Sequence, residues 1–306
     1  MSGPRRAPAV DRAVDILNYL AAHPTDAFSM SELSRLLGIN NASVHAVLGA
    51  LTKAGYVERH PRHRTYRLGP GLVVVGQAAL SQHRAITEAT TEIDALSKQL
   101  DLEVVVTALV GADMVYVGSA GRPQLSAPQF RVGQRVPCVP PYGTVHMAWS
   151  SPDEIEDWLK GAPTVLTPEQ RTKQLGILDA VRARGYAVGL DLGSAHIDVN
   201  RMSESLTDAP GREDLKRDIN ALFERLGNAE YQLETLGSGE IYDISMISAP
   251  VFDPQGRVAV AITLAGLPRH LEAAVVVEYA ETVTRTARAV SKRVLGVPPV
   301  PIQLSP

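Results

Sequence analysis

The chain has 306 residues, 45% hydrophobic and 21% charged, with a net charge of −3, a composition that favours one large or two ordinary globular domains. No apolar run approaches the roughly 18–20 residues that span a bilayer, and no apolar signal segment follows Arg6. The single cysteine, Cys138, excludes an internal disulfide framework and a cysteine-rich zinc site. We therefore expect a soluble, cytoplasmic protein without a membrane partner.

The charge is unevenly distributed along the chain. Residues 1–70 hold nine Lys and Arg against five Asp and Glu, a net charge of +4. The remaining residues hold 21 against 28, a net charge of −7. A basic segment joined to an acidic body is expected where only that segment meets a polyanion. A chance fluctuation among so few charges is the alternative explanation.

Two helices are predicted near the N-terminus. Residues 9–22 carry apolar side chains at spacings of three and four, and Pro24 lies just past their end. The second helix begins near Ser29, because Ser29-Met30-Ser31-Glu32 fits a capping box, in which serine and glutamate each accept a backbone N–H of the other. Gly38 permits the left-handed exit that a tight turn requires.

A third helix and a hairpin complete the first 70 residues. The helix follows Asn40, a favourable N-cap, and ends at Gly55. Its apolar stripe consists of Val44, Val47, Leu48 and Leu51. Its outward side consists of Asn41, Ser43, His45, Ala46 and Gly49. Residues 56–59 and 65–68 are predicted as short strands joined by a tip rich in histidine and arginine. This order predicts a winged helix-turn-helix domain over residues 1–70.

A second domain of different character is predicted after a linker. Residues 71–101 are expected to form a linker helix with a break near His83. The expected strands of residues 102–296 are 103–109, 114–118, 130–132, 186–190, 231–235, 241–252 and 257–265. The expected helices are a short one after Gly143, then 152–160, 168–184, 212–226 and 270–295. Hairpins connect most of the strands, which predicts an α/β domain with a mainly antiparallel sheet, followed by a loose tail over 297–306.

The outward side of the third helix carries groups that can read DNA. The major groove of B-form DNA, roughly 12 Å wide, admits one helix, whose polar side chains meet base edges. Arginines at the hairpin tip suit phosphate or minor-groove contacts. The predicted DNA-binding residues are Ser31, Asn40, Asn41, Ser43, His45, Lys53, Arg59, Arg62, His63 and Arg64. For each of them taken alone, helix capping or a solvated turn is the alternative explanation.

Several stretches also carry a family likeness. In the first domain they are 31–39 (SELSRLLGI), 50–59 (ALTKAGYVER) and 66–69 (YRLG); in the second they are 131–133 (RVG), Gly143, 184–188 (RGYAV) and 248–253 (SAPVFD) with 256–257 (GR). The chain resembles the IclR (isocitrate lyase regulator) family, more weakly in its second half. The resemblance implies a transcription regulator whose GAF-like or profilin-like C-terminal domain holds a small effector. It also implies a homodimer or dimer of dimers on partly palindromic double-stranded operator DNA.

The recognition helix departs from the family pattern. Family members usually have Ser-Thr and, three positions after the threonine, an arginine; this chain has Ala42, Ser43 and Ala46 there. Arginine is the group that most often reads guanine. Readout must therefore depend on Asn41, Ser43, His45 and the hairpin, and the operator sequence cannot be carried over from the family.

The expected effector site departs further. The family often has Arg-Cys where this chain has Ser245-Met246, and residues 196–240 form an insertion in place of a short loop. By resemblance, the candidate effector-binding residues are Tyr142, Gly143, Asp191, Ile244, Met246 and Thr263. The loss of polar groups favours a larger apolar or aromatic ligand over a small keto acid. Ile244 and Met246 are equally explained as core residues, and Asp191 as a local cap.

Enzymatic function finds little support in the sequence. It contains no Gly-x-Ser-x-Gly elbow, phosphate loop or dinucleotide-binding glycine pattern. Cys138 with His146 is a conceivable nucleophilic pair, but a buried thiol is the commoner case, and His60 and His63 lack a third metal ligand. We predict no catalytic residue, metal or cofactor. The favoured function is an effector-responsive regulator; the alternatives are a regulator whose C-terminal domain serves only oligomerisation or protein contacts and, least favoured, an enzyme with a DNA-binding appendage.

Overall fold

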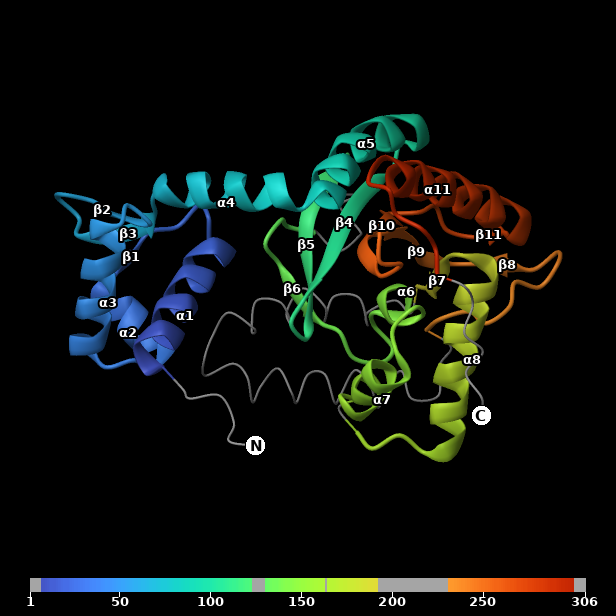
Figure 1. Cartoon of the computed structure of the whole chain (residues 1–306), viewed down its shortest axis with the longest axis horizontal. Coiled ribbons are helices and arrows are strands. Elements are labelled where there is room, and N and C mark those ends of the chain that lie inside the picture. The colour runs from blue at the N-terminus through green and yellow to red at the C-terminus, as the bar shows by residue number, and fades with distance from the viewer. Residues whose placement is uncertain (1–6, 123–129, 163, 192–230, 300–306) are drawn as a thin grey trace. The chain divides into compact units, whose positions relative to one another are not determined.

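The computed structural model describes residues 7–122, 130–162, 164–191 and 231–299 (Figure 1). These residues divide into two compact units, one that ends at Gln82 and one that begins at His83. Each unit has a hydrophobic core of its own. Within the described ranges, none of the helices has the length and apolar character that crossing a membrane requires.

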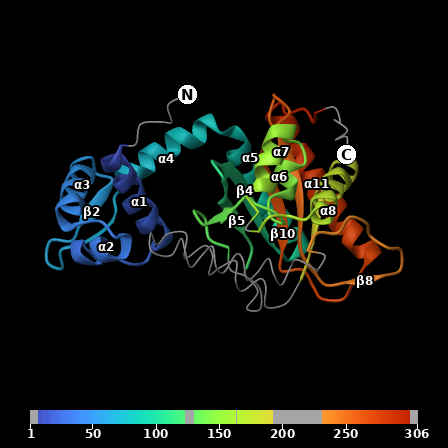
Figure 2. The same cartoon turned by 90° about the horizontal axis from the view of Figure 1, so that it is seen from below.

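The first unit combines helices with a small antiparallel sheet (Figure 2). Its elements in chain order are α1 (Pro8–Ala22), β1 (Phe28–Ser29), α2 (Met30–Leu37), α3 (Asn41–Lys53), β2 (Val57–Arg59), β3 (Thr65–Leu68) and α4 (Gly71–Gln82). The strand order is β1-β3-β2. The winged helix-turn-helix fold predicted from the sequence is confirmed.

Local signals set the helix boundaries of this unit. The Ser29 hydroxyl accepts the N–H of Glu32, and the Glu32 carboxylate accepts the Ser29 N–H at 2.7 Å, which completes the predicted capping box. Gly38 ends α2 in the left-handed region with a φ of 63°, and Asn40 caps α3. Each signal lies within a few residues of the boundary that it sets. The boundaries predicted from the sequence therefore agree closely with those of the structure.

The strand β1 was not predicted. Phe28 pairs with Tyr66 and Ser29 with Thr65, so the strand is only two residues long and its partner lies far along the chain. A two-residue strand shows no alternation of polar and apolar side chains. The pairing nevertheless joins the segment before α2 to the β2–β3 hairpin, beside the core that α1, α2 and α3 share.

The expected linker helix over residues 71–101 is divided in two at His83, near the predicted break. α4 has no buried residue, whereas α5 (Arg84–Leu100) buries Ala89, Ile93 and Leu96 in the core of the second unit. Only α4 therefore has the character of a linker, and α5 is a packed element of the second unit.

The second unit is built on a six-stranded antiparallel sheet with the order β6-β5-β4-β10-β9-β7. Its strands are β4 (Glu103–Val110), β5 (Asp113–Ala120), β6 (Arg135–Pro137), β7 (Ala187–Leu190), β9 (Ile244–Phe252) and β10 (Val258–Ala265), and β8 (Ile241–Tyr242) pairs separately with β11 (Leu271–Glu272). Its helices, besides α5, are α6 (Thr144–Met147), α7 (Pro152–Lys160), α8 (Pro168–Arg184) and α11 (Ala273–Arg293). The predicted α/β class with an antiparallel sheet is confirmed.

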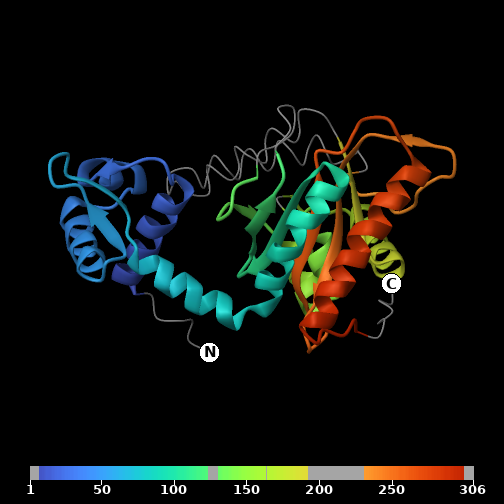
Figure 3. The same cartoon turned by 90° about the horizontal axis from the view of Figure 1, so that it is seen from above.

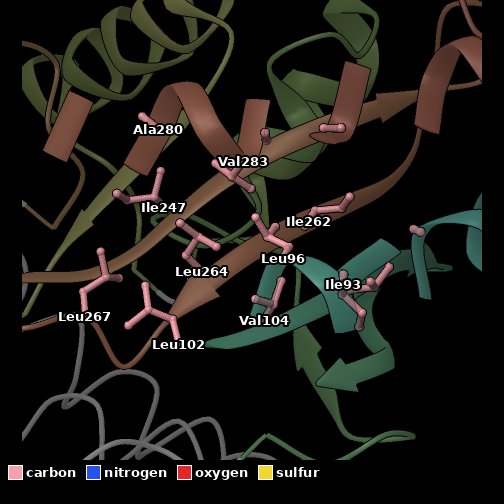
Figure 4. Close-up of a cluster of buried hydrophobic side chains, with 14 of the residues drawn as sticks. Ile93, Leu96, Leu102, Val104, Ile247, Ile262, Leu264, Leu267, Ala280 and Val283 are labelled. Carbon is pink, nitrogen blue, oxygen red and sulfur yellow. The ribbon is translucent and has the colours of Figure 1, made fainter. Parts of the chain in front are cut away.

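Helices cover both faces of this sheet. α5 and α11 lie side by side on one face (Figure 3). Their apolar side chains meet those of β4, β9 and β10 in a common core, among them Ile93, Val104, Ile262 and Val283 (Figure 4). α6, α7 and α8 form a second cluster that includes Ala261 of β10. Because successive strand residues point to opposite faces, the strand residues outside the first core face α6–α8.

The strand expected at 130–132 is wrong. The third strand of the β4–β5 hairpin is β6 instead, where Val136 pairs with Met114. Residues 131–134 form a turn, with a hydrogen bond from the Gln134 N–H to the Arg131 carbonyl and a φ of 90° at Gly133. The apolar residues of this segment were too few to fix the register of a strand.

The strand expected at 231–235 is also wrong, and the predicted helix 212–226 lies outside the described residues. Gln232 forms an isolated bridge with Gly189, and Leu233 donates its N–H to the carbonyl of Val188. Tyr231, Gln232 and Leu233 are all buried, so this segment lacks the alternation of a strand with one solvated face. Of the insertion 196–240, only residues 231–240 are described.

Candidate nucleic-acid interface and effector site

The helix α3 has two chemically different sides. The buried side consists of the predicted stripe Val44, Val47, Leu48 and Leu51. Asn41 and His45, one helical turn apart, are exposed on the outward side. Asn41 is the first residue of the helix, so the exposed polar groups gather at the end that enters the major groove in helix-turn-helix proteins.

Two other predicted reading residues are held by neighbours. The Asn40 Oδ1 accepts the Ser43 N–H at 2.9 Å, which makes Asn40 the N-cap of α3. The Ser43 hydroxyl lies 2.9 Å from the Arg12 guanidinium of α1, which donates to it. Asn40 and Ser43 therefore stabilise the start of α3, in agreement with helix capping, the alternative explanation for these residues. Sequence reasoning missed Arg12, since nothing in the sequence pairs positions 12 and 43.

The start of α2 contributes Ser31, the remaining serine of the predicted set. Ser31 is exposed, and its hydroxyl lies 3.2 Å from that of Ser29, the N-cap of α2. A hydroxyl at this position lies beside the backbone N–H groups of a helix N-terminus, which can bind a phosphate.

The β2–β3 hairpin is the wing of this domain, and its tip, residues 60–64, is ordered by its own hydrogen bonds. The His60 Nδ1 accepts the backbone N–H groups of Arg62 and His63 at 3.2 and 3.1 Å. The ring of His63 lies 4.6 Å from that of His60. Arg64 turns the chain back toward β3 with a φ of 55°. The backbone that carries the two tip arginines is therefore already folded, while their side chains are exposed.

The cations of this unit differ in whether they are neutralised. Arg67 pairs with Glu58 at 2.9 Å. Arg67 is not in the predicted set, whose lysine and arginines make no ion pair with any residue that the structure describes: Lys53, Arg59, Arg62 and Arg64. The Arg59 guanidinium lies 5.9 Å from the centre of the Tyr66 ring, within range of a cation–π contact. The unneutralised cations are the ones suited to phosphate.

The second unit gathers polar side chains on the sheet face that α5 and α11 leave uncovered. Directly paired residues of antiparallel strands point to the same face. Glu103, Ala265 and Met246 are paired in one row across β4, β10 and β9, and Thr263 pairs with Ser248 in the next. We call the polar residues of this side, with Met246, the polar sheet face: Glu103, Thr107, Tyr116, Met246, Ser248 and Thr263.

Four of the six predicted effector residues lie on or beside this face. Met246 and Thr263 belong to it, and the Thr263 and Ser248 hydroxyls are 2.7 Å apart. Tyr142 packs edge-on against Tyr231 at 5.3 Å, and the Tyr231 hydroxyl lies 3.8 Å from the Met246 sulfur. Gly143 follows Tyr142 with a φ of 84°, and a Cβ there would lie 2.3 Å from the Cys138 Sγ. Backbone geometry thus explains that glycine.

The two remaining effector candidates have other surroundings. Ile244 is buried in the core on the opposite side of the sheet, which agrees with the core explanation. Asp191 follows the end of β7, where its carboxylate accepts a hydrogen bond from Arg269 at 3.3 Å and its N–H donates to the Asp243 carbonyl.

Sequence reasoning missed Glu103 and considered His146 only as a partner of Cys138, yet both are buried titratable groups of this region. Glu103 is 1% exposed, and burial raises its pKa to about 7. His146 on α6 is 3% exposed, and burial lowers its pKa to about 4. The His146 Nε2 lies 3.1 Å from the Thr107 hydroxyl of β4. A glutamate that begins a run of valines was the one available signal for Glu103.

The alternatives from catalytic chemistry find no support in this geometry. Burial raises the pKa of the Cys138 thiol to about 12, whereas a thiol nucleophile needs a lowered pKa. In the described ranges, no three His, Cys, Asp or Glu side chains are grouped so as to hold a metal ion. A surface hollow of about 650 Å³ between α11 and the start of β7 contains none of the predicted effector residues.

A winged helix with an exposed polar recognition surface, joined to an α/β unit, defines a DNA-binding regulator. Residues 9–61 match the IclR helix-turn-helix domain, and residues 77–191 match the family described as Bacterial transcriptional regulator IclR C-terminal. The two matches follow one another in the order that the resemblance predicts and together cover more than half of the chain. The protein belongs to the IclR family of transcriptional regulators, which are not enzymes.

Individual relatives agree with this assignment. The chain is 26% identical over 185 residues to the HTH-type transcriptional regulator XynR of Escherichia coli, a match that covers 59% of this chain and 73% of XynR. The crystal structure of an IclR regulator from Alicyclobacillus acidocaldarius superposes with a TM-score of 0.66 at 20% identity, covering 95% of this chain and all of that one. An IclR homologue from Microbacterium hydrocarbonoxydans, solved with 4-hydroxybenzoate, gives a TM-score of 0.60 at 14% identity over 94% of this chain and 98% of its own.

Proposed function

We propose that this protein binds operator DNA through α3 and the wing, and that a small organic effector bound at the polar sheet face changes that binding. One observation supports DNA binding most strongly. The same domain has exposed Asn41 and His45 on α3 and a wing whose cations lack carboxylate partners among the described residues. We assign DNA binding to residues 1–70, the linker to 71–101 and effector binding and oligomerisation to 102–296. Because the target is DNA, we place the protein in the cytoplasm.

The contacts divide into reading and positioning. Asn41 and His45 face the bases, since an exposed amide and imidazole can hydrogen-bond to base edges in the major groove. Lys53, Arg59, Arg62, His63 and Arg64 contact the phosphate backbone. Asn40 and Ser43 hold the helix start in place, and Ser31 lies at the N-terminus of α2, where backbone N–H groups favour a phosphate.

A second copy of the chain completes the DNA-binding form. One recognition helix reads too few base pairs to define an operator, and two must lie about 34 Å apart, or a multiple of that, to bind together. α4 offers the contact surface: Val73 and Val74 are 63% and 71% exposed, and Val75 and Leu80 are exposed as well. We propose that α4 of the linker forms the homodimer contact and that residues 102–296 pair two such dimers into a dimer of dimers.

The effector part rests on the mixture of rings and polar groups at one end of the sheet face. Tyr142, Tyr231 and Met246 are in contact there, and Tyr116 is half-buried nearby. Such a set suits an effector with a ring and a few polar atoms. The related structure from Microbacterium hydrocarbonoxydans holds 4-hydroxybenzoate, an aromatic compound. An effector that prefers one spacing of the two wings shifts the population toward or away from the DNA-binding form.

The test has two stages. Genomic fragments captured by the purified protein define an operator, and fluorescence anisotropy then measures its affinity with and without each compound of a metabolite panel. A compound that binds the folded protein raises its melting temperature, and an effector must also shift operator affinity. If no compound does either, the alternative holds, in which the second unit serves only oligomerisation or protein contacts. Failure to enrich any fragment would overturn the DNA-binding part.

A further inference from the structure

Glu103 is a buried acid without a cationic partner among the described residues. It begins β4, it is 1% exposed, and neither carboxylate oxygen has a hydrogen-bond partner among the residues that the structure describes. Buried polar groups in native proteins are almost always hydrogen-bonded, and one that is not calls for an explanation such as a ligand. An unpaired carboxylate at this depth destabilises the ligand-free protein.

Two partly buried carboxylates of the same unit have a cationic partner, unlike Glu103. Asp113 pairs with Arg135, and Asp191 with Arg269, both at 3.3 Å. No Lys or Arg of the described chain forms an ion pair with Glu103. The Ser119 hydroxyl on the neighbouring strand only partly offsets the effect of burial. The site therefore contains a buried carboxylate that no described cation neutralises.

The surroundings of Glu103 specify what kind of donor fits. Its row across the sheet continues through Ala265 to Met246, which the Tyr231 hydroxyl approaches at 3.8 Å. Glu103 also lies close enough to Tyr116 to act on that phenol electrostatically, after the larger effects of burial and of Tyr231. A carboxylate beside tyrosine rings is the combination that binds ammonium groups, by ion pairing and by cation–π attraction.

We propose that the effector carries a cationic amine attached to a ring or apolar body, and that Glu103 binds the amine. This inference rests on the proposed effector site and adds the chemical class of its ligand. It distinguishes this protein from the homologue that holds 4-hydroxybenzoate, whose carboxylate would repel an ionised Glu103.

A matched pair of ligands tests this assignment. 2-Phenylethylamine and 3-phenylpropionate share a ring and a two-carbon chain and differ in the sign of the end group. Isothermal titration calorimetry on the full-length protein should show at least tenfold tighter binding of the amine. In Glu103→Gln the amine should bind at least tenfold more weakly and the preference should vanish. Glu281→Gln, the same change at an exposed position of α11, should leave both affinities unchanged.

A proton count gives a second readout that does not depend on affinity alone. Glu103 must ionise to bind an amine, so at about pH 6 binding should release close to one proton, measured by calorimetry in buffers of different ionisation enthalpy. The titratable groups around it stay neutral there: burial raises the pKa values of Tyr116 and Tyr231 and lowers that of His146. Glu103→Gln should release none, and circular dichroism reports whether that variant is folded.

The possible failures are distinguishable. If carboxylates from a wider panel raise the melting temperature, amines do not, and Glu103→Gln changes nothing, the effector site stands and the amine assignment is wrong. A protein that no compound of the panel stabilises would overturn the effector function and the amine assignment with it. Equal amine affinity in the wild type and in Glu103→Gln, with no proton released, also overturns the assignment.

Discussion

The charged side chains of the winged helix lie at its surface, whereas the acid of the polar sheet face lies inside the second unit. Arg62 and Arg64 are exposed on a folded tip and lack carboxylate partners in the described part of the chain. Glu103 is buried beside tyrosines. Exposed charge acts over about 8–10 Å at physiological salt and suits a polyanion of any sequence. A buried charge is screened less by salt, but only a ligand that enters the fold can meet it, which suits the choice of one small molecule.

The largest expected effect concerns the surface that joins two winged helices. Val74→Asp places a charge in the exposed apolar stretch of α4 and should abolish the dimer at micromolar concentration, together with specific operator binding. Sedimentation velocity and anisotropy measure the two effects. Ala79→Asp, an exposed position of α4 that does not share a helix side with Val74, is the control and should leave the dimer intact. A dimer that survives Val74→Asp would place the subunit contact elsewhere.

The next largest effect concerns the exposed cations. Arg62→Ala with Arg64→Ala should weaken binding to operator and random DNA alike, by about 100-fold at low salt, and should reduce the slope of log K against log salt by about two. Anisotropy over a salt series measures both. Arg67→Ala is the matched control, because Glu58 already neutralises this wing arginine. An unchanged slope in the double variant would remove the wing tip from the interface.

The buried groups Glu103 and His146 should affect the pH dependence of the free energy of unfolding rather than the salt dependence of DNA binding. Between pH 4.5 and about 7 folded Glu103 keeps a proton that the unfolded chain has lost, so its contribution to stability falls as pH rises. Between about pH 4 and 6.5 folded His146 lacks a proton that the unfolded chain binds, so its contribution rises with pH. Where the two windows overlap, these opposite slopes nearly cancel.

Single variants should separate the two slopes. Relative to the wild type, the free energy of unfolding of Glu103→Gln should rise by about 1.4 kcal/mol per pH unit within the overlap, and that of His146→Gln should fall by about the same amount. Urea unfolding at several pH values measures both. Identical pH profiles in all three proteins would show that neither group titrates abnormally in the folded state.

The smallest expected effect concerns base reading. Asn41→Ala should lower affinity for the operator by about tenfold and leave affinity for random DNA almost unchanged, because a base contact contributes about 1–3 kcal/mol of discrimination. Competition anisotropy measures the ratio of the two affinities. Thr52→Ala, an exposed change at the far end of α3, is the control. Equal losses on both DNAs would assign Asn41 to the phosphate backbone.

The two units also differ in how much the sequence could predict. The boundaries of α2 and α3 followed from Ser29, Gly38 and Asn40, because caps act on groups a few residues away. The role of Ser43 could not follow, since its partner Arg12 comes from another helix. Strand β6 was misplaced and Glu103 was missed for a related reason: register and burial in a sheet depend on strands far along the chain.

The solitary cysteine offers a practical route to the geometry of the assembled regulator. Since the Cys138 thiol is buried and ionises only near pH 12, alkylating probes should leave it largely untouched at neutral pH. A new cysteine placed on the wing would then be the one reactive position of each subunit. Spin labels or fluorophores attached there would report the separation of the two wings directly, with and without a candidate amine.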